Sequence, residues 1–214
     1  MNLPQLSLSN MGSSRRNSKL LALMISVAIA IAFSCTEAPY EFSGAVSDPP
    51  QVIGDFVLTD QYGDAFTMSS DANDVSIVFF GYTLCPDVCP TTLADMIKAK
   101  RALGEDAERV SFIWVTVDPE RDTPGVLKQR IEVFDPEFIG LSGSRETLTK
   151  VWDDFGIFVE RDDSQNSAAG YLVSHTANLY LVDNMRSKVV FPFGTHSDSI
   201  AADIKAVLNS QEEN

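Results

Sequence analysis

The alternation of apolar and polar positions predicts buried strands separated by amphipathic helices. Residues 75–80 and 110–117 are almost continuously apolar, β-branched or aromatic, as expected for strands that are buried on both faces. Each is followed by apolar residues at helical spacing, over residues 91–103 and from residue 123 to about residue 134. Strands that alternate with helices in this way are typical of a layered α/β domain.

The rest of the chain adds a hairpin before these elements and more strands and helices after them. The pattern predicts a β-hairpin at 54–68, a short strand at 138–141, a helix at 145–155 capped by Ser144, a polar surface loop at 160–170, strands at 171–182 and 188–193, and a closing helix at 198–208. This order of elements predicts an α/β, thioredoxin-like fold with an added N-terminal β-hairpin.

The clearest chemical signal lies between the first buried strand and its helix. Cys85 and Cys89 stand in this turn, and Pro90 suits the first turn of a helix, so Cys89 is expected near the N-cap. The partial positive charge of a helix N-terminus favours thiolate over thiol, and thiolates attack disulfides and bind soft metals. A structural disulfide is the alternative, but a bridge across so short a loop constrains the unfolded chain little.

A histidine far along the chain is a candidate third ligand. His175 lies in an alternating segment in which residues 171, 173 and 175 share one face. In a thioredoxin-like domain this strand passes opposite the cysteine turn, so Cys85, Cys89 and His175 would form a two-sulfur, one-nitrogen site. Such a site suits Cu(I), and it suits Cu(II) or Zn²⁺ with a further ligand. The alternative is a core histidine bonded to the backbone. His196 is expected at a helix N-terminus, away from the metal.

Two further groups of side chains bear on this site. Asp118 ends the second buried strand, so its carboxylate is a candidate group beside the metal ligands, with turn capping as the alternative. Met68, Met96 and Met185 are scattered along the chain, and we expect them to pack in the core.

The N-terminal residues predict targeting to a membrane. Residues 1–34 combine a basic start with an apolar stretch shorter than the roughly 20 residues that a spanning helix needs. The stretch ends at Cys35 in a context that resembles a bacterial lipoprotein processing site, so Cys35 is the candidate lipid anchor, with a short uncleaved membrane anchor as the alternative. Residues 35–53 are expected to be a flexible tether and 54–210 the globular domain, in a periplasmic or other extracytoplasmic location.

The charge of the chain excludes one class of partner. The net charge is −14, and the first 34 residues contain three basic side chains and no acid, so the remainder is more acidic still. A domain of this kind has no basic stripe with which to hold a phosphate backbone, and we expect no nucleic-acid partner.

Three motifs together resemble the SCO/SenC family of membrane-anchored copper proteins: residues 81–90 with both cysteines, the block 117–124, and the segment 171–183 with His175. The resemblance implies a copper metallochaperone that binds copper through Cys85, Cys89 and His175 and helps to assemble the dinuclear copper centre of cytochrome c oxidase. It also implies accessory thiol–disulfide chemistry, with the copper-site subunit of the oxidase and an upstream copper donor or thiol reductant as partners. The family usually has an aspartate where this chain has Ser174.

Two enzyme functions remain as alternatives. The first is a metal-independent thiol–disulfide oxidoreductase that uses Cys85 and Cys89, and the second is a thiol peroxidase. Thioredoxin-type oxidoreductases have two residues between their cysteines and a cis-proline facing them, whereas this chain has three residues between and no proline from 137 to 191. A peroxiredoxin-like site would have a proline upstream of Thr83, and residues 78–80 contain none.

Overall fold

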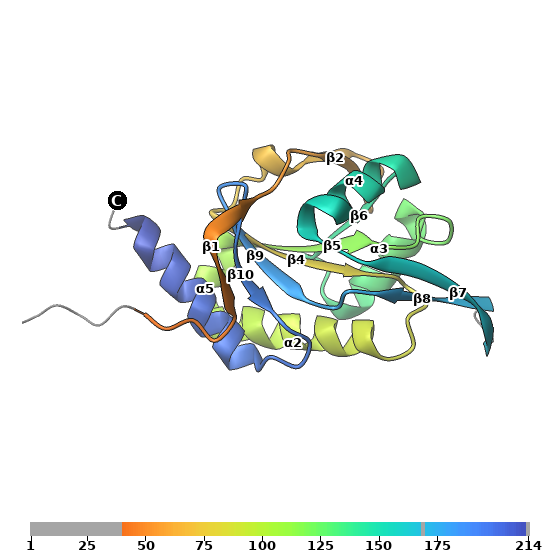
Figure 1. The fold of residues 1–214 in the computed structure, drawn as a ribbon. Coiled ribbons are helices and arrows are strands. Elements are labelled where there is room, and N and C mark those ends of the chain that lie inside the picture. The colour runs from red at the N-terminus through yellow and green to blue at the C-terminus, as the bar shows by residue number, and fades with distance from the viewer. Residues whose placement is uncertain (1–39, 168–169, 213–214) are drawn as a thin grey trace, which may run out of the picture. The chain divides into compact units, whose positions relative to one another are not determined.

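A mixed eight-stranded sheet forms the centre of the fold in this computed structural model, which describes residues 40–167 and 170–212 (Figure 1). The strands lie in the order β1-β10-β9-β4-β5-β6-β2-β3, and β7 and β8 form a separate two-stranded sheet. Their bounds are β1 Ala45–Val52, β2 Val57–Asp60, β3 Ala65–Thr67, β4 Val75–Gly81, β5 Val110–Thr116, β6 Ile139–Ser142, β7 Val159–Ser167, β8 Gly170–His175, β9 Leu179–Asp183 and β10 Arg186–Phe191.

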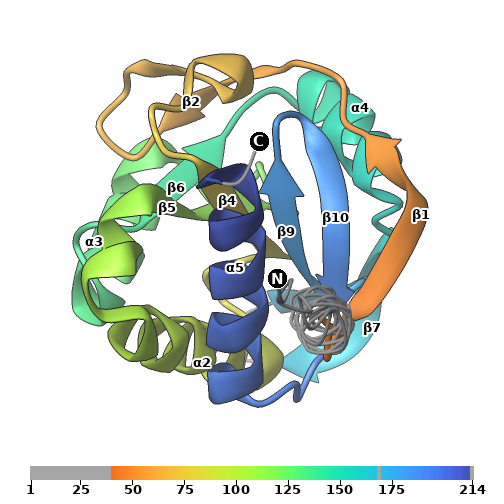
Figure 2. The same ribbon diagram turned by 90° about the vertical axis from the view of Figure 1, so that its left-hand side faces the viewer.

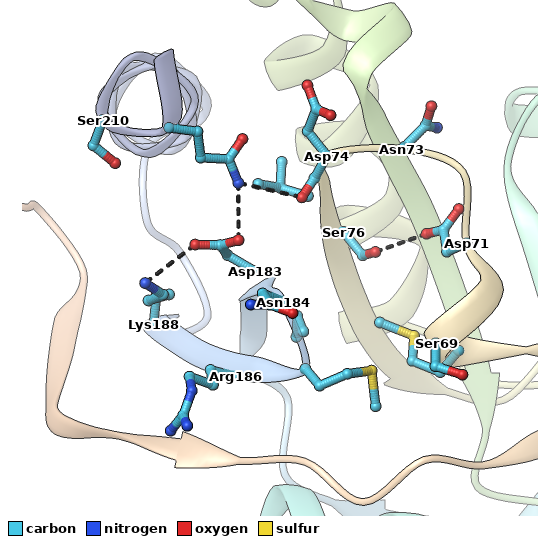
Figure 3. A pocket seen from close by; sticks show the side chains of 15 residues that line it. Ser69, Asp71, Asn73, Asp74, Ser76, Asp183, Asn184, Arg186, Lys188 and Ser210 are labelled. Carbon is cyan, nitrogen blue, oxygen red and sulfur yellow. Dashed lines mark hydrogen bonds and ion pairs between the residues drawn. The ribbon is translucent and has the colours of Figure 1, made fainter. Parts of the chain in front are cut away.

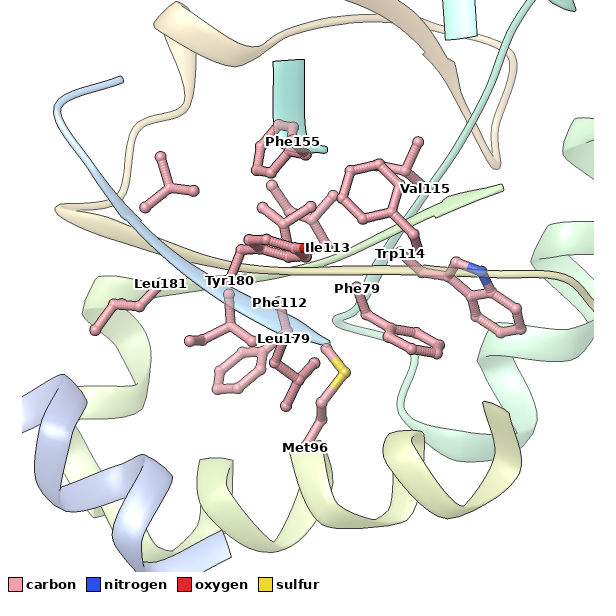
Figure 4. Packing of buried hydrophobic residues seen from close by; sticks show 14 of the residues in the cluster. Phe79, Met96, Phe112, Ile113, Trp114, Val115, Phe155, Leu179, Tyr180 and Leu181 are labelled. Carbon is pink, nitrogen blue, oxygen red and sulfur yellow. The ribbon is translucent and has the colours of Figure 1, made fainter. Parts of the chain in front are cut away.

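The three central strands are parallel and supply the core. β4 pairs in parallel with β5, and β5 with β6, while β9 runs antiparallel to β4 on its other side. Every residue of β4 and β5 is buried, as their continuous apolar sequences predict. Successive side chains point to opposite faces, so Phe79 packs beside Trp114 and Phe80 packs against Phe155 on the other face. Figure 4 shows Phe79 and Phe155 on opposite sides of the sheet.

The four predicted helices are present and cover both faces of the sheet (Figure 1). They are α2 Val88–Leu103, α3 Pro124–Phe134, α4 Arg145–Phe155 and α5 Ser197–Glu212. α2 packs against α5, and α4 lies on the opposite face, where Phe155 contacts Phe80. The predicted cap of α4 is confirmed, because the Ser144 hydroxyl accepts a hydrogen bond from the N–H of Thr147 at 3.1 Å.

The strand predicted at 171–182 is interrupted. β8 ends at His175 and β9 begins at Leu179, so the chain leaves the small sheet and enters the large one between them. The loop predicted at 160–170 is also wrong, because most of it is β7, which pairs with β8. The composition of β7 suggested a loop because Glu160, Arg161 and Asp163 are all charged. They are tolerated in a strand because they are exposed in a ribbon that extends beyond the main sheet (Figure 1).

The flexible tether predicted at 35–53 is wrong for residues 45–52. These residues form β1, an edge strand that pairs antiparallel with β10 and is visible beside it in Figure 2. The register shifts between Val46 and Gln51, and Pro49 and Pro50 fall within this irregularity, at a sheet edge where a missing N–H is tolerated. The buried Asp203 of α5 secures the segment just before β1 by accepting the backbone N–H groups of Ser43 and Gly44 at 2.9 and 3.0 Å.

Two other predictions concern the ends of the domain. The N-terminal hairpin is confirmed as β2 and β3, which lie at the far edge of the sheet beside β6. The predicted targeting segment at 1–34 and the candidate anchor Cys35 lie outside the described residues. Within residues 40–167 and 170–212, none of the helices combines the length and the apolar character needed to cross a membrane.

The docking of the segment before β1 can be tested at Gly44. A Cβ atom there would lie 2.4 Å from Cγ1 of Val189 and 2.8 Å from the ring of Phe191. We therefore expect Gly44→Ala to lower the free energy of unfolding, measured by urea titration, by about 1–3 kcal/mol. Gly125→Ala is the control, because a Cβ at Gly125 meets nothing within 4 Å and alanine favours helix α3. Equal stability of the Gly44→Ala and wild-type proteins would show that this segment is loose.

Candidate metal centre

The cysteine turn begins where β4 ends. The chain turns after Gly81, the N–H of Cys85 donates to the carbonyl of Tyr82 at 3.2 Å, and α2 begins at Val88. A Cβ atom at Gly81 would lie 3.0 Å from the sulfur of Cys89 and 2.7 Å from the ring of Phe79. A glycine at the end of β4 therefore lets the helix bring Cys89 close against the strand.

The two thiols occupy different chemical environments. Cys89 is fully buried and Cys85 is 8% exposed, and both are free. The backbone N–H of Cys89, in the first turn of α2, points at the sulfur of Cys85 at 3.4 Å, whereas the N-cap residue Asp87 makes no side-chain cap. The Cys85 sulfur thus occupies the place of a capping group, where the helix N-terminus favours negative charge.

The two sulfurs share one proton unequally. A hydrogen bond with the Cys89 thiol lowers the pKa of Cys85 to about 3, although burial acts in the opposite direction. The same hydrogen bond, together with burial, raises the pKa of Cys89. At neutral pH the reduced pair therefore consists of a Cys85 thiolate and a Cys89 thiol that donates to it.

His175 reaches this pair from the end of β8. Its Nε2 lies 3.8 Å from the sulfur of Cys89, and its Nδ1 lies 3.0 Å from the carbonyl oxygen of Thr176. A carbonyl only accepts, so Nδ1 donates this hydrogen bond, and Nε2 is the ring nitrogen that faces the sulfurs, which is the orientation of a metal ligand. The rings of Tyr82 and Phe79 pack against the imidazole edge-on, with centroids at 5.9 and 6.4 Å.

The donor atoms of Cys85, Cys89 and His175 all lie within 4.8 Å of one another. Ligand atoms that share one metal ion at about 2.0–2.3 Å are spaced about 3.5–4 Å apart, so small movements would bring all three onto one ion. Two sulfurs and one imidazole nitrogen are a soft donor set, and the half-buried imidazole leaves the site accessible from one side. The three residues predicted from the sequence as ligands are therefore brought together as a possible metal-binding group.

Asp118 does not contact the sulfurs directly. Its carboxylate is almost fully buried, accepts the phenol of Tyr171 at 2.7 Å and pairs with the guanidinium of Arg121. Its backbone carbonyl accepts the N–H groups of Arg121 and Asp122, so it also closes the turn after β5. Asp118 lies outside the group of possible ligands and is linked to it through the strand that carries His175.

Asp122 is a fully buried carboxylate under the cysteine turn, and the sequence pattern did not single it out. It accepts the N–H and the hydroxyl of Thr83 at 3.1 and 2.5 Å and the hydroxyl of Thr116 at 2.6 Å. Burial raises its pKa, although the hydrogen bonds from Thr116 and Thr83 lower it. Its place as the third acid of the block 117–124, after Asp118 and Glu120, was the available signal, but only the fold shows that it supports the turn.

The remaining candidates lie elsewhere. His196 is exposed and immediately precedes α5, as predicted. Met68 and Met96 are buried in the core, and Met185 packs against it. Ser174, which stands where the resemblance leads one to expect an aspartate, is exposed on the face of β8 opposite His175.

A cavity of about 670 Å³ lies at the other end of the sheet, where β4 begins (Figure 3). It includes Val75 and Ser76, so the length of β4, roughly 20 Å, separates it from the cysteine turn. Its polar side chains largely pair with one another: Asp183 binds Lys188 at 3.1 Å and Gln211 at 2.8 Å. None of the three possible metal ligands lines this cavity.

Comparison with known proteins bears on both the fold and the site. The sequence model of the SCO1/SenC family matches residues 44–209. A SCO2-like protein of Rickettsia felis is 33% identical over 168 residues, which amount to 77% of this chain and 82% of the relative.

Two solved structures are similar over nearly their whole length. Bradyrhizobium japonicum ScoI with copper bound is 39% identical, with a TM-score of 0.65 over 72% of this chain and 98% of that one. A SCO1/SenC family lipoprotein from Bacillus anthracis is 27% identical, with a TM-score of 0.64 over 74% and 96%. The thioredoxin-like fold and the match over most of the sequence establish that the chain belongs to the SCO1/SenC family.

Proposed function

We propose that this protein is a copper chaperone that binds copper through Cys85, Cys89 and His175 and delivers it to the dinuclear copper centre of cytochrome c oxidase. The observation that carries the proposal is the convergence of two sulfurs and one imidazole, from segments 86 residues apart, to within 4.8 Å. The similarity to a copper-bound ScoI supports copper, as Cu(I) or Cu(II), as the ion.

The geometry favours capture followed by ligand exchange. Cys85 is already a thiolate and Nε2 of His175 already faces the sulfurs, so the Cys89 proton must leave when copper is captured. The half-buried His175 lies on the accessible side of the group. A cysteine or histidine of the oxidase subunit can replace His175 first and the two sulfurs afterwards, so that the ion remains coordinated throughout.

The same proposal includes a membrane location. The apolar stretch within residues 1–34 and Cys35 suit either a lipoprotein signal or a short anchor, and the similarity to a Bacillus anthracis lipoprotein supports the first. The domain would then face the periplasm or an equivalent extracytoplasmic space. There it would meet the copper-site subunit of the oxidase, an upstream copper donor and a thiol reductant.

A metal-independent thiol–disulfide oxidoreductase remains the second candidate, because a Cys85 thiolate beside a protonated Cys89 is also a suitable nucleophile. The residue that faces the pair is His175, however, and among the described residues the one cis peptide bond is Asp48–Pro49, in β1 and not opposite the cysteines. An insulin reduction assay at full rate with metals chelated would favour the enzyme.

Substitution of the histidines tests the copper site. We expect His175→Ala to weaken Cu(I) binding by the reduced protein by on the order of 100-fold or more, because loss of groups that merely orient a ligand already costs about 10–100-fold. Competition with a chromophoric Cu(I) chelator measures the affinity. His196→Ala is the matched control and should bind like the wild type, because His196 is exposed at the start of α5. Unchanged affinity of His175→Ala would refute the copper site.

The ionisation of the thiols predicts an unusual pH profile for alkylation. The pKa of Cys85 is lowered to about 3, so its thiolate persists as the pH falls, and iodoacetamide should label Cys85 at a nearly constant rate from roughly pH 8 to pH 5. An ordinary thiol would react about tenfold more slowly with each unit below its pKa of about 8.5. Peptide mass mapping separates Cys85 from Cys35 and from the slowly reacting Cys89. A tenfold loss per pH unit at Cys85 would contradict the assignment.

A further inference from the structure

The ribbon that carries His175 is separate from the main sheet. β7 and β8 pair only with each other among the described strands, and they extend beyond the large sheet (Figure 1). The chain joins the main sheet again only at Leu179, after the interruption that follows His175. The position of His175 over the sulfurs therefore depends on side-chain contacts between β8 and the cysteine half of the domain.

Those contacts come from the face of β8 that residues 171, 173 and 175 share. Tyr171 binds the turn after β5, the N–H of Val173 donates to the phenol oxygen of Tyr82 at 3.4 Å, and His175 meets Cys89. Tyr171 and His175 are four residues, or about 13 Å, apart along the strand. Tyr171 is thus the far attachment point of the strand whose other end supplies the ligand.

Arg121 makes this attachment. Its guanidinium lies over the ring of Tyr171, with Cζ 3.5 Å from the ring centroid, and its Nη1 donates to the carbonyl of Tyr171 at 2.9 Å. Its Nε pairs with the buried carboxylate of Asp118, which also accepts the Tyr171 phenol. Cζ of Arg121 lies 5.6 Å from the ring centroid of Tyr82, so one side chain touches both the cysteine turn and β8.

We propose that Arg121 is a positioning residue for copper binding: it holds β8, through Tyr171, in the place where Nε2 of His175 can meet the two sulfurs. The inference rests on the proposed function and deepens it. The contacts require arginine specifically, because a planar guanidinium can stack on a ring, pair with a carboxylate and donate to a carbonyl at once, whereas a lysine ammonium cannot. The Arg121 side chain is 17% exposed, so these contacts are shielded from water.

A double-mutant cycle tests the proposal. We expect Arg121→Gln to weaken Cu(I) binding about 10- to 100-fold. On a logarithmic scale, Arg121→Lys should lose at least half as much Cu(I) affinity as Arg121→Gln. In the His175→Ala background the same Arg121 substitutions should have no further effect, because the ligand that Arg121 positions is gone. Arg145→Gln is the matched control. Arg145 lies in α4, is half exposed and pairs with Glu120, the neighbour of Arg121, so its loss should leave the Cu(I) affinity unchanged.

Amide hydrogen exchange gives a readout that does not involve copper. In the metal-free protein, Arg121→Lys should speed exchange at residues 171–175 and leave β4 and β5 unchanged, which also verifies that the variant is folded. The proposal is overturned if Arg121→Gln binds copper like the wild type, or if its loss is equally large in the His175→Ala background. In either case, if His175→Ala still loses Cu(I) affinity, the proposed copper site stands and only the role of Arg121 fails. Failure of the copper proposal itself would instead appear as unchanged affinity in His175→Ala.

Discussion

The contact between the imidazole of His175 and the sulfur of Cys89 is the interaction on which the proposed chemistry depends. It joins residues 86 positions apart that no strand pairing connects within the described part of the chain, because β8 belongs to the small ribbon and Cys89 to the first turn of α2. A ligand group assembled in this way needs two rigid sides. The parallel strands β4 and β5 provide the first, and the contacts of Tyr171, Val173 and His175 provide the second.

Buried acids support both sides of the site from one short segment. Asp122 lies under the cysteine turn and accepts the N–H and the hydroxyl of Thr83, while Asp118 holds Arg121 and Tyr171 beside β8. Each carboxylate has its hydrogen-bond partners, which is the condition under which a buried acid is tolerated. The block 117–124 therefore acts as a bridge between the segment that carries the sulfurs and the segment that carries the imidazole.

The protonation pattern suits a protein that accepts and releases a soft ion. One sulfur is ionised at the helix N-terminus, the other retains its proton, and Nε2 of the imidazole is turned toward both. A group of three donors with one accessible side lacks the closed, four-ligand shell that makes structural metal sites permanent. Because the fourth coordination position is open, a ligand of a partner protein can bind the ion there before it is released.

Local sequence determined much of the structure. The continuous apolar runs of β4 and β5, the cap at Ser144 and the cysteine turn before α2 were predicted correctly, because each depends on neighbours along the chain. Alternation along β8 also placed residues 171, 173 and 175 on one face, and the two cysteines suggested His175 as their third partner.

Other features were decided only by tertiary contacts. The residues of β1 and β7 are polar or proline-containing and became strands because β10 and β8 offered partners, which no local pattern reveals. The roles of Asp122 and Arg121 depend on which segments lie opposite them in space. Side-chain periodicity specifies the face of an element, whereas the packing of the whole chain determines what that face meets.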